Sequence, residues 1–511
     1  MKSNLLKLSN KIMIRKEHFG GILFNKDTGD VIEVDREALT VISILEDIEI
    51  VDIKTLLDLP ISYKGRRINK ERIKSVLSEL KAMGIINLMP NGVLSEDYRK
   101  MLKAKSFTKF KWPMYEHLSA PEAVHWAVTF KCGESCPDCY IERHKRLFAG
   151  ELDTQDSLKM VDKIANSGVF QLAIGGGEPF MRNDLENIVS CASWKGLAVH
   201  ITTGKYEIER NRLDALAEHI KTLQIGIRTD EFSNKGKHAV EKLKVLLTQL
   251  DERNIITGAN LIMTKSAVQN FDEIIEMLIN IGFKRYTLLR YKPPKNVKRW
   301  IQEKPDKHDL DLLEERLTAA QEMHTDLLFR IDCALSFLER RLNPQTALYS
   351  GLRGCVAGER IISVAPDGSV YPCSQLVGDI FYAGNLLHED FESIWNRSNV
   401  IKKYRGFREK KSFKNGNCGK CQVKAFCGGC RAFAEDAIGS DPGCPEPIYE
   451  SKYLDDEYDV IADIQDTIGY TDAGFPYVTR EEIEKWLEED NQRDYPSWII
   501  NNDELTGGNW K

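Results

Sequence analysis

The chain has 511 residues, 42% hydrophobic residues and a formal net charge of −6. This length predicts two to four domains with a sizeable core, and the charge gives no reason to expect nucleic acid as a partner. No apolar run approaches the ~18 residues that span a bilayer. The N-terminus has no apolar core of signal-peptide length. We therefore expect a cytoplasmic protein whose partners include neither nucleic acid nor a membrane.

The first segment, residues 1–90, alternates short strands with helices. The predicted strands are Lys11–Arg15, Gly21–Phe24 and Val31–Val34, and the predicted helices are Arg36–Leu45, Ile53–Leu57 and Asn69–Met83. In the last helix, apolar residues recur at helical spacing, at Ile73, Val76, Leu77 and Leu80. This order predicts a winged-helix-like domain, and residues 91–120 follow it as a connector that is basic in its middle.

From residue 121 to residue 300 the chain repeats a strand followed by a helix. The strand-like runs are Val124–Phe130, Phe170–Ile174, Leu197–Thr202, Thr222–Ile227, Ile256–Met263 and Arg285–Leu289, and the helical stretches between them include Asp156–Ser167, Asp214–Ile220, Val240–Leu250 and Phe271–Ile281. Six such units predict a parallel sheet, and they are too few for a closed eight-fold barrel. We therefore expect an α/β fold, a partial (β/α)6 TIM-like barrel with ligands at the carboxyl ends of its strands.

The rest of the chain divides by composition. Residues 301–354 are predicted to be a helical bridging region, residues 355–450 are dense in cysteine and loops, and residues 451–511 form an acidic tail. That tail holds 16 Asp or Glu against 5 Lys or Arg. The chain has 12 cysteines. In a reducing compartment so many cysteines favour metal or redox chemistry over disulfides.

Three cysteines follow the first strand of the predicted sheet directly. Cys132, Cys136 and Cys139 have the spacing C-x3-C-x2-C on one short loop, so they can hold three corners of a cubane iron–sulfur cluster. The fourth iron then has no cysteine, and an open coordination position marks a catalytic metal site. A zinc site is the alternative, but zinc loops usually pair C-x2-C with a second such pair, and none lies nearby.

This spacing resembles the signature of the radical S-adenosylmethionine (SAM) superfamily. The resemblance implies that the open iron chelates SAM, and that reductive cleavage of SAM yields a 5′-deoxyadenosyl radical that abstracts a substrate hydrogen. The second strand ends in the family's GGEP motif, formed here by Gly176, Gly177, Glu178 and Pro179. Glycines let the backbone approach a ligand closely, and the carboxylate can pair with the SAM ammonium. One departure is that Asp138 stands where the family usually has an aromatic residue, with Tyr140 following the third cysteine.

Three further residues at strand ends are candidate SAM contacts. Thr202 and Thr203 resemble the polar residues that contact the SAM ribose, and they are equally consistent with ordinary strand residues. Arg228 ends the fourth strand, where it can reach the SAM carboxylate or the substrate, or pair with Asp230. No residue can be assigned as a catalytic acid or base from the sequence.

The cysteines of the C-terminal part have a second informative spacing. They are Cys355, Cys373, Cys418, Cys421, Cys427, Cys430 and Cys444. The pattern resembles the SPASM domain, an auxiliary-cluster module of peptide-modifying radical SAM enzymes, although only two residues separate Cys427 from Cys430 where three are usual. A structural zinc ribbon built by Cys418, Cys421, Cys427 and Cys430 is the alternative.

The SPASM resemblance implies two auxiliary 4Fe–4S clusters, and therefore three clusters in the chain. It assigns one cluster to Cys418, Cys421, Cys427 and Cys444, and the other to Cys355, Cys373 and Cys430. For this second cluster we expect either an open iron, able to bind a substrate thiolate, or a long reach from Cys333, which lies 22 residues before Cys355. Cys191 is interpreted as a small core residue.

The N-terminal segment resembles the precursor-recognition domain of ribosomal peptide maturation, which binds a leader peptide as an extra strand. Together these resemblances imply a radical SAM maturase of a ribosomally made precursor peptide, with reduced ferredoxin or flavodoxin as electron donor. The expected product is a thioether crosslink, with carbon–carbon crosslinking, epimerisation and decarboxylation as alternatives. A winged-helix regulator with structural zinc or redox clusters is the alternative of another class, because the helix Asn69–Met83 holds several Lys and Arg.

Overall fold

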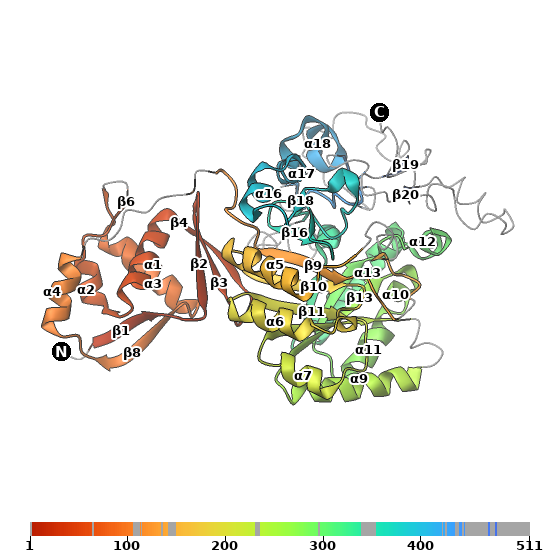
Figure 1. The fold of residues 1–511 in the computed structure, drawn as a ribbon, viewed down its shortest axis with the longest axis horizontal. Helices are drawn as coiled ribbons and strands as arrows, with labels where there is room; N and C mark the ends of the chain where they lie inside the picture. Colours follow the sequence, from red (N-terminus) through yellow and green to blue (C-terminus); the bar gives the residue numbers. More distant parts are fainter. Residues whose placement is uncertain are drawn as a thin grey trace. The chain divides into compact units, whose positions relative to one another are not determined.

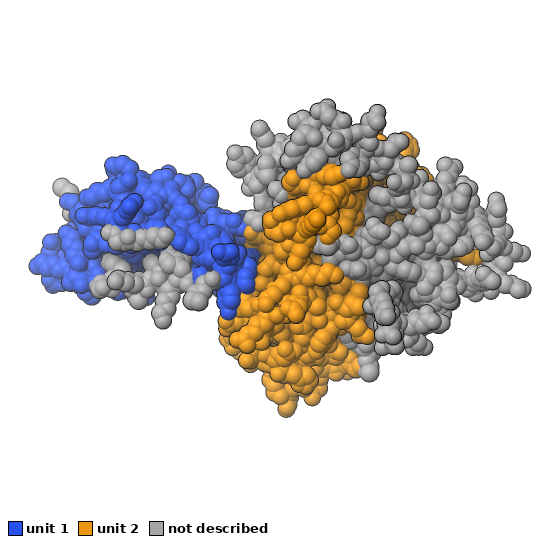
Figure 2. Space-filling view, turned by 90° about the horizontal axis from the view of Figure 1, so that it is seen from above, with its two compact units in different colours: residues 1–120 blue, residues 121–511 orange. Residues whose placement is uncertain are grey.

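A computed structural model of the chain describes residues 3–63, 66–105, 113, 115–133, 136–141, 150–229, 236–294, 297–338, 354–421, 423–424, 427–434, 439–441, 444, 469–470 and 476–477. The chain divides into two compact units, residues 1–120 and residues 121–511, which Figure 1 shows as ribbons and Figure 2 as coloured surfaces. The predictions that concern residue 230 and most of the acidic tail lie outside the described residues.

The first unit combines two small antiparallel sheets with helices. Its elements are β1 (Ser3–Leu8), β2 (Ile12–Glu17), β3 (Gly20–Asn25), β4 (Val31–Asp35), α1 (Arg36–Ile48), β5 (Val51–Asp52), α2 (Ile53–Asp58), β6 (Ser62–Tyr63), β7 (Arg66–Arg67), α3 (Lys70–Ala82), β8 (Ile86–Gly92) and α4 (Glu96–Ala104). One sheet has the order β2-β3-β4 and the other the order β5-β1-β8. The helix starts follow from capping side chains, since Asp35 accepts from Ala38 N and Asn69 accepts from Arg72 N.

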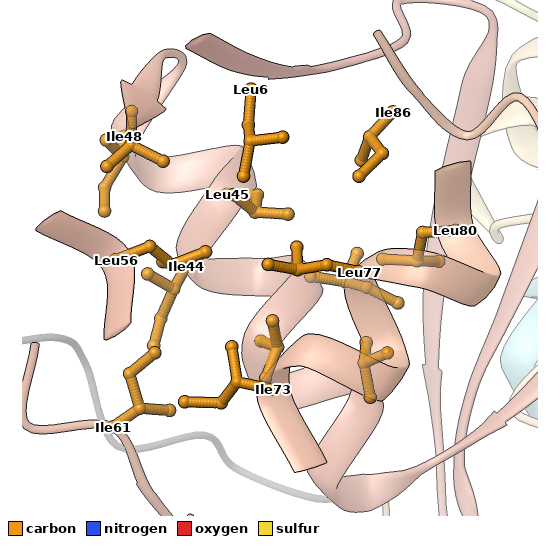
Figure 3. Packing of buried hydrophobic residues seen from close by; sticks show 14 of the residues in the cluster. Leu6, Ile44, Leu45, Ile48, Leu56, Ile61, Ile73, Leu77, Leu80 and Ile86 are labelled. Carbon is orange, nitrogen blue, oxygen red and sulfur yellow. The ribbon is translucent and has the colours of Figure 1, made fainter. Parts of the chain in front are cut away.

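Apolar side chains from both helices and strands form the core of this first unit (Figure 3). The predicted apolar face of α3 is confirmed, because all four of its residues are buried. They pack with Leu6 of β1 and with Ile44 and Leu45 of α1. The sequence did not predict β1, β8 or α4. Strand β1 pairs with β8 in the register Leu8↔Ile86, a contact between distant segments that local patterns do not reveal.

The second unit begins with alternating strands and helices. Its first elements are β9 (Ala123–Thr129), α5 (Thr154–Asn166), β10 (Gln171–Gly176), η3 (Pro179–Met181), α6 (Leu185–Trp194), β11 (Ala198–Thr203), α7 (Arg210–Leu216), β12 (Ile220–Ile227), α9 (Gly236–Asp251), β13 (Ile256–Met263), α10 (Lys265–Gln269), α11 (Phe271–Ile281), β14 (Arg285–Arg290), α12 (Val297–Glu303), α13 (Lys307–Met323) and β15 (Leu328–Ile331). Strands β9 to β15 are parallel and neighbour one another in chain order. Helices such as α6 against β11 and α9 against β13 cover the sheet (Figure 1).

The cysteine-rich segment extends the same sheet. Its elements are η4 (Cys333–Leu335), β16 (Ile361–Val364), β17 (Ser369–Tyr371), η5 (Asp379–Phe381), β18 (Gly384–Asn385), α16 (Phe391–Arg397), α17 (Asn399–Arg405), η6 (Phe407–Glu409), α18 (Lys411–Asn415) and α19 (Asn417–Lys420). Strand β16 pairs in parallel with β9, and β17 and β18 follow it as antiparallel strands. The cysteine region is therefore attached next to the strand that carries the first cysteine loop. Further along, β19 (Gly469–Tyr470) pairs with β20 (Pro476–Tyr477).

The predicted α/β class with a large parallel sheet is confirmed, and it fits a TIM-like partial barrel. The described sheet holds β15 and β16 in addition to the six predicted parallel strands. The predicted helix Asp214–Ile220 is wrong in position, because α7 ends at Leu216 and Ile220 pairs with Val199 at the start of β12. Among the described helices, none is long and apolar enough to cross a membrane.

Candidate metal and cofactor site

The first cysteine loop lies at the carboxyl end of β9. Cys132, Cys136 and Cys139 are each partly buried, and the Cys139 amide donates to the Cys136 carbonyl at 3.1 Å. Burial raises the pKa of the Cys136 thiol, the Arg228 guanidinium opposes this shift, and the nearby thiols of Cys139 and Cys132 add to it. The structure therefore brings the three predicted ligands together.

The glycines after β10 run alongside this loop. Gly176 has φ +113°, and a Cβ atom there would lie 2.3 Å from the Thr129 carbonyl oxygen. The Gly177 amide donates to that same oxygen at 2.8 Å, and the Glu178 amide donates to the Lys131 carbonyl at 2.9 Å. Only glycine allows this close approach with positive φ, so the motif is fitted against the start of the cysteine loop.

The Glu178 carboxylate is 2% exposed and is held by three donors. It accepts hydrogen bonds from the Phe180 amide at 3.1 Å, the Thr203 hydroxyl at 2.9 Å and the Gly204 amide at 2.9 Å. An ionised carboxylate offers about four lone-pair positions. It therefore retains room for a further donor, such as an ammonium group. Pro179 follows it at the start of η3 and is buried.

The other candidate SAM contacts are distributed around Glu178. Thr203 is buried and donates to the Glu178 carboxylate, whereas Thr202 is exposed. The Arg228 guanidinium donates to the Gly204 carbonyl at 3.0 Å and hydrogen-bonds to the Cys136 thiol. Arg228 therefore lies between the cysteine loop and the end of β11, which is a position that local sequence patterns could only suggest.

Asp138 is the residue at which the cysteine loop departs from the family pattern. Its carboxylate accepts two hydrogen bonds from Arg299 of α12, at 2.7 Å and 2.8 Å, and one from the Tyr291 hydroxyl at 2.7 Å. Bidentate pairs of this kind are strong and directional. The hydrogen bond with Asp138 raises the pKa of Arg299. Burial raises the pKa of Tyr291, and the negative charge of Asp138 raises it further. An ion pair with Arg299 therefore occupies the position where the family usually has an aromatic side chain. Nothing in the sequence indicated that Arg299 would be the partner of Asp138.

The C-terminal cysteines fall into two neighbouring groups. Burial raises the pKa of the Cys373 thiol to about 11, and the nearby Cys355 thiol contributes to this increase. Burial also raises the pKa of the Cys430 thiol, and Cys355 makes the next largest contribution. In the other group, burial raises the pKa of Cys418 to about 11 with a contribution from Cys427. Burial raises the pKa of Cys427 as well, and Cys421 adds to it. Cys444 donates its amide to the Asp441 carbonyl at 3.3 Å.

Two residues to which the sequence assigned no role, Arg290 and Asp441, join these groups to the barrel. Arg290, at the end of β14, donates to both oxygens of Asp441 at 2.7 Å and 3.0 Å. Asp441 in turn accepts from the Cys430 amide at 2.8 Å and donates its own amide to the Cys418 sulfur at 3.2 Å. The pair therefore contacts one predicted ligand of each auxiliary cluster. Arg290 directly follows the predicted strand Arg285–Leu289, but nothing near Asp441 in the sequence indicated that the two residues pair.

The donor set fits iron–sulfur clusters, which proteins hold through cysteine thiolates. Buried thiols with raised pKa values keep their protons in the absence of a metal, and coordination deprotonates them. Within the described part of the chain, no three His, Cys, Asp or Glu side chains converge closely enough to hold one ion. A single zinc ion requires each sulfur at about 2.3 Å, whereas a cluster binds each thiolate through a different iron.

Family models match two parts of the chain. Residues 126–291 match the radical SAM superfamily, and residues 355–422 match SPASM, an iron–sulfur cluster-binding domain. The first match covers the cysteine loop, the GGEP motif and the strand ends around them. The second begins at Cys355 and ends one residue after Cys421.

Several known proteins are similar to this chain. An AdoMet-dependent heme synthase of Methanosarcina barkeri is 25% identical over 345 residues, which cover 63% of this chain and 94% of that protein. The mycofactocin maturase MftC of Mycobacterium tuberculosis is 27% identical over 340 residues, which cover 64% and 83%. The crystal structure of Streptococcus suis SuiB bound to S-adenosylmethionine has a TM-score of 0.59 at 20% identity, over 87% of this chain and 99% of that one. At this identity the structural likeness shows the fold alone.

Proposed function

Because the chain is a radical SAM protein with a SPASM iron–sulfur cluster-binding domain, we propose that it modifies a ribosomally made precursor peptide. One observation carries the proposal: the backbone of the GGEP motif is hydrogen-bonded to the end of β9 and to the start of the cysteine loop, from Gly177 N to Thr129 O and from Glu178 N to Lys131 O. Ligands of parallel α/β sheets bind at this edge.

We assign the cofactor contacts to residues of this edge. Cys132, Cys136 and Cys139 would hold the cluster that binds SAM, and Glu178 would receive the SAM ammonium on its remaining lone pair. Thr203 and Gly204 orient that carboxylate by donating to it. Thr202 is the exposed residue available for the ribose.

The bound cofactors supply the chemistry, since reduced iron and SAM yield an adenosyl radical for hydrogen abstraction, and auxiliary clusters accept electrons. We propose three 4Fe–4S clusters in total, with reduced ferredoxin or flavodoxin as the donor. The chain's own residues hold these groups at one edge of the sheet. Arg228 bonds to both the Cys136 thiol and the Gly204 carbonyl, which ties the cluster loop to the strand end beside Glu178.

The peptide substrate is supported by the relatives and by the first unit of the chain. MftC is named a maturase, and one SuiB structure, with a TM-score of 0.57, contains the precursor peptide SuiA. In the first unit, β2 and β4 are the outer strands of a three-stranded antiparallel sheet. An extended leader can add to such an edge through main-chain hydrogen bonds. We propose a winged-helix-like leader-recognition domain here.

A heme precursor is a second candidate substrate, because the relative from Methanosarcina barkeri is named a heme synthase. That match covers 63% of this chain, whereas the likeness to SuiB covers 87%. The sheet edge of the first unit favours the peptide, because an extended peptide can pair with such an edge through main-chain hydrogen bonds. For the product we propose a thioether crosslink, in which a C–H and an S–H bond are lost and a C–S bond forms.

The first test measures 5′-deoxyadenosine formed from SAM by the dithionite-reduced, reconstituted protein. Wild type is expected to form it, and the Cys132/Cys136/Cys139→Ala variant is not. A wild-type protein that holds zinc in these positions and leaves SAM intact would refute the radical reaction and favour the regulator alternative.

The second test adds a synthetic cysteine-containing candidate precursor peptide with its leader and follows its mass and its free thiols. Loss of two hydrogens together with one alkylatable thiol indicates a thioether, and the same mass with all thiols retained indicates a carbon–carbon bond. An unchanged precursor, with conversion of an added porphyrin precursor, would refute the peptide assignment. Deleting the leader should raise KM more than it lowers kcat.

A further inference from the structure

We propose that Cys333 is the fourth thiolate ligand of the auxiliary cluster assigned to Cys355, Cys373 and Cys430. This inference rests on the proposed iron–sulfur function of the C-terminal cysteines. It closes the coordination of that cluster, so that no iron remains to bind a substrate thiolate. The auxiliary cluster would then act in peptide modification as an electron acceptor rather than as a site of substrate ligation.

The position of Cys333 is set by the last parallel strand. Strand β15 pairs with β14, and the Asp332 amide continues this ladder by donating to a β14 carbonyl at 2.8 Å. Asp332 then caps η4, accepting from the Ala334 amide at 3.1 Å, and pairs with Lys292 at 2.9 Å. Both side chains of that ion pair are largely buried, at 13% and 12% exposure. Cys333 therefore leaves the carboxyl edge of the sheet in a turn held by hydrogen bonds and an ion pair.

The same turn packs against the cysteine-rich region. Ala334 is 3% exposed and belongs to one buried cluster with Cys355 and Cys430. Two residues further on, the Ser336 hydroxyl donates to the Cys427 sulfur at 3.3 Å. Contacts on both sides of the turn thus place the backbone beside predicted ligands of both auxiliary clusters.

The surroundings of the Cys333 thiol identify which cluster it serves. Cys355 and Cys430 belong to the same buried cluster as Ala334, the next residue after Cys333, and Cys373 packs against that cluster. Those three thiols are the three ligands assigned to the cluster that lacked a fourth. A cysteine that served only as a small apolar core residue would gain nothing from a buried carboxylate and three thiols as neighbours. One cluster would give the four cysteine sulfurs a common set of iron partners.

The experiment uses the full chain carrying Cys132/Cys136/Cys139→Ala, so that only the auxiliary clusters contribute. In this background Cys333→Ala is compared with Cys191→Ala, which removes the other cysteine outside the motifs. After anaerobic reconstitution, the Cys191 variant should keep about eight irons per chain, and the Cys333 variant should lose between about one and four. Equal iron content in the two variants, with identical spectra of the reduced clusters, would overturn the proposal.

A second measurement needs no change at Cys333. The electron paramagnetic resonance spectrum of the reduced auxiliary clusters is recorded before and after adding 2-mercaptoethanol. In the background protein a closed cluster should leave the spectrum unchanged, and any cluster retained in the Cys333→Ala variant should respond because its iron is open. A response in the background protein would overturn the proposal. Absence of iron from the background protein would instead refute the iron–sulfur function on which the inference rests.

Discussion

The ion pair between Arg290 and Asp441 should be the most sensitive contact between the barrel and the cysteine-rich region. Its side chains are 11% and 0% exposed, and both oxygens of Asp441 accept from the guanidinium. One of these oxygens also accepts from the Cys430 amide. Asp441→Asn keeps the shape of the side chain but directs an NH2 group at a donor and leaves the Arg290 charge buried.

The magnitude follows from burial. Removing one partner of a buried ion pair costs about 3–5 kcal/mol, because the remaining charge has lost its compensation. Each kcal/mol shifts the melting temperature of a domain of a few hundred residues by about 2–4 °C. We therefore expect Asp441→Asn to lower the apparent melting temperature of the reconstituted protein by roughly 6–20 °C and to reduce its iron content.

The assay is thermal unfolding at a fixed scan rate under anaerobic conditions, with iron measured on the same samples. Glu409→Gln is the matched control, since Glu409 pairs with Lys414 at 2.8 Å but the two side chains are 82% and 55% exposed. An exposed pair contributes little to stability, so this control should melt close to wild type. The shortest N–O distances of the two pairs are nearly equal, at 2.7 Å and 2.8 Å, whereas their burial differs strongly.

A double substitution tests the reasoning further. Replacing both partners, Arg290→Met with Asp441→Leu, should be less damaging than the sum of the single changes, because no buried charge remains. Each kcal/mol corresponds to about 2–4 °C in melting temperature. If the Asp441→Asn variant melts within about 1 °C of the Glu409→Gln variant, burial does not make the Arg290–Asp441 pair important.

Three further predictions concern the cofactor edge and the sheet. Gly176→Ala should weaken SAM binding at least about tenfold in equilibrium dialysis, because φ +113° strains an alanine by about 1–3 kcal/mol, whereas Gly175→Ala meets no atom within 4 Å and should bind normally. Thr203→Val removes a donor to a buried carboxylate, a loss of about 1.5–3 kcal/mol, and should weaken SAM binding about tenfold or more, unlike the surface control Thr248→Val. Burial lowers the pKa of His200 to about 4, so the unfolded chain binds this proton first and stability falls as pH drops below about 6.5. From pH 7.5 to 5.5 wild type should lose about 1.5 kcal/mol more than His200→Gln by denaturant unfolding, and equal losses would contradict the shift.

Local patterns were enough to predict the elements whose apolar spacing is regular. The α3 face is an example, since its four apolar residues recur at helical spacing and all are buried. The strands of the parallel sheet were also predictable, because buried parallel strands are short apolar runs separated by helices. Strand β15 was missed because its four residues alternate between half-buried and exposed, and only its pairing with β14 makes it a strand.

Ligand chemistry could be predicted in the same way wherever the ligands share one loop. Cys132, Cys136 and Cys139 lie within eight residues, so their spacing alone indicates a shared metal site. The GGEP motif could be predicted as a ligand turn, but the reason for its glycines is a contact with Thr129, which belongs to another strand.

The sequence by itself determined which chemical groups are available and which of them are near in the chain. The tertiary structure decided the partnerships across long separations: Asp138 with Arg299, Arg290 with Asp441, and Ser336 with Cys427. The physical reason is that a parallel sheet collects the carboxyl ends of strands from distant parts of the chain at one edge. Which side chains meet there depends on strand order and register, and neither is encoded in the local spacing of residues.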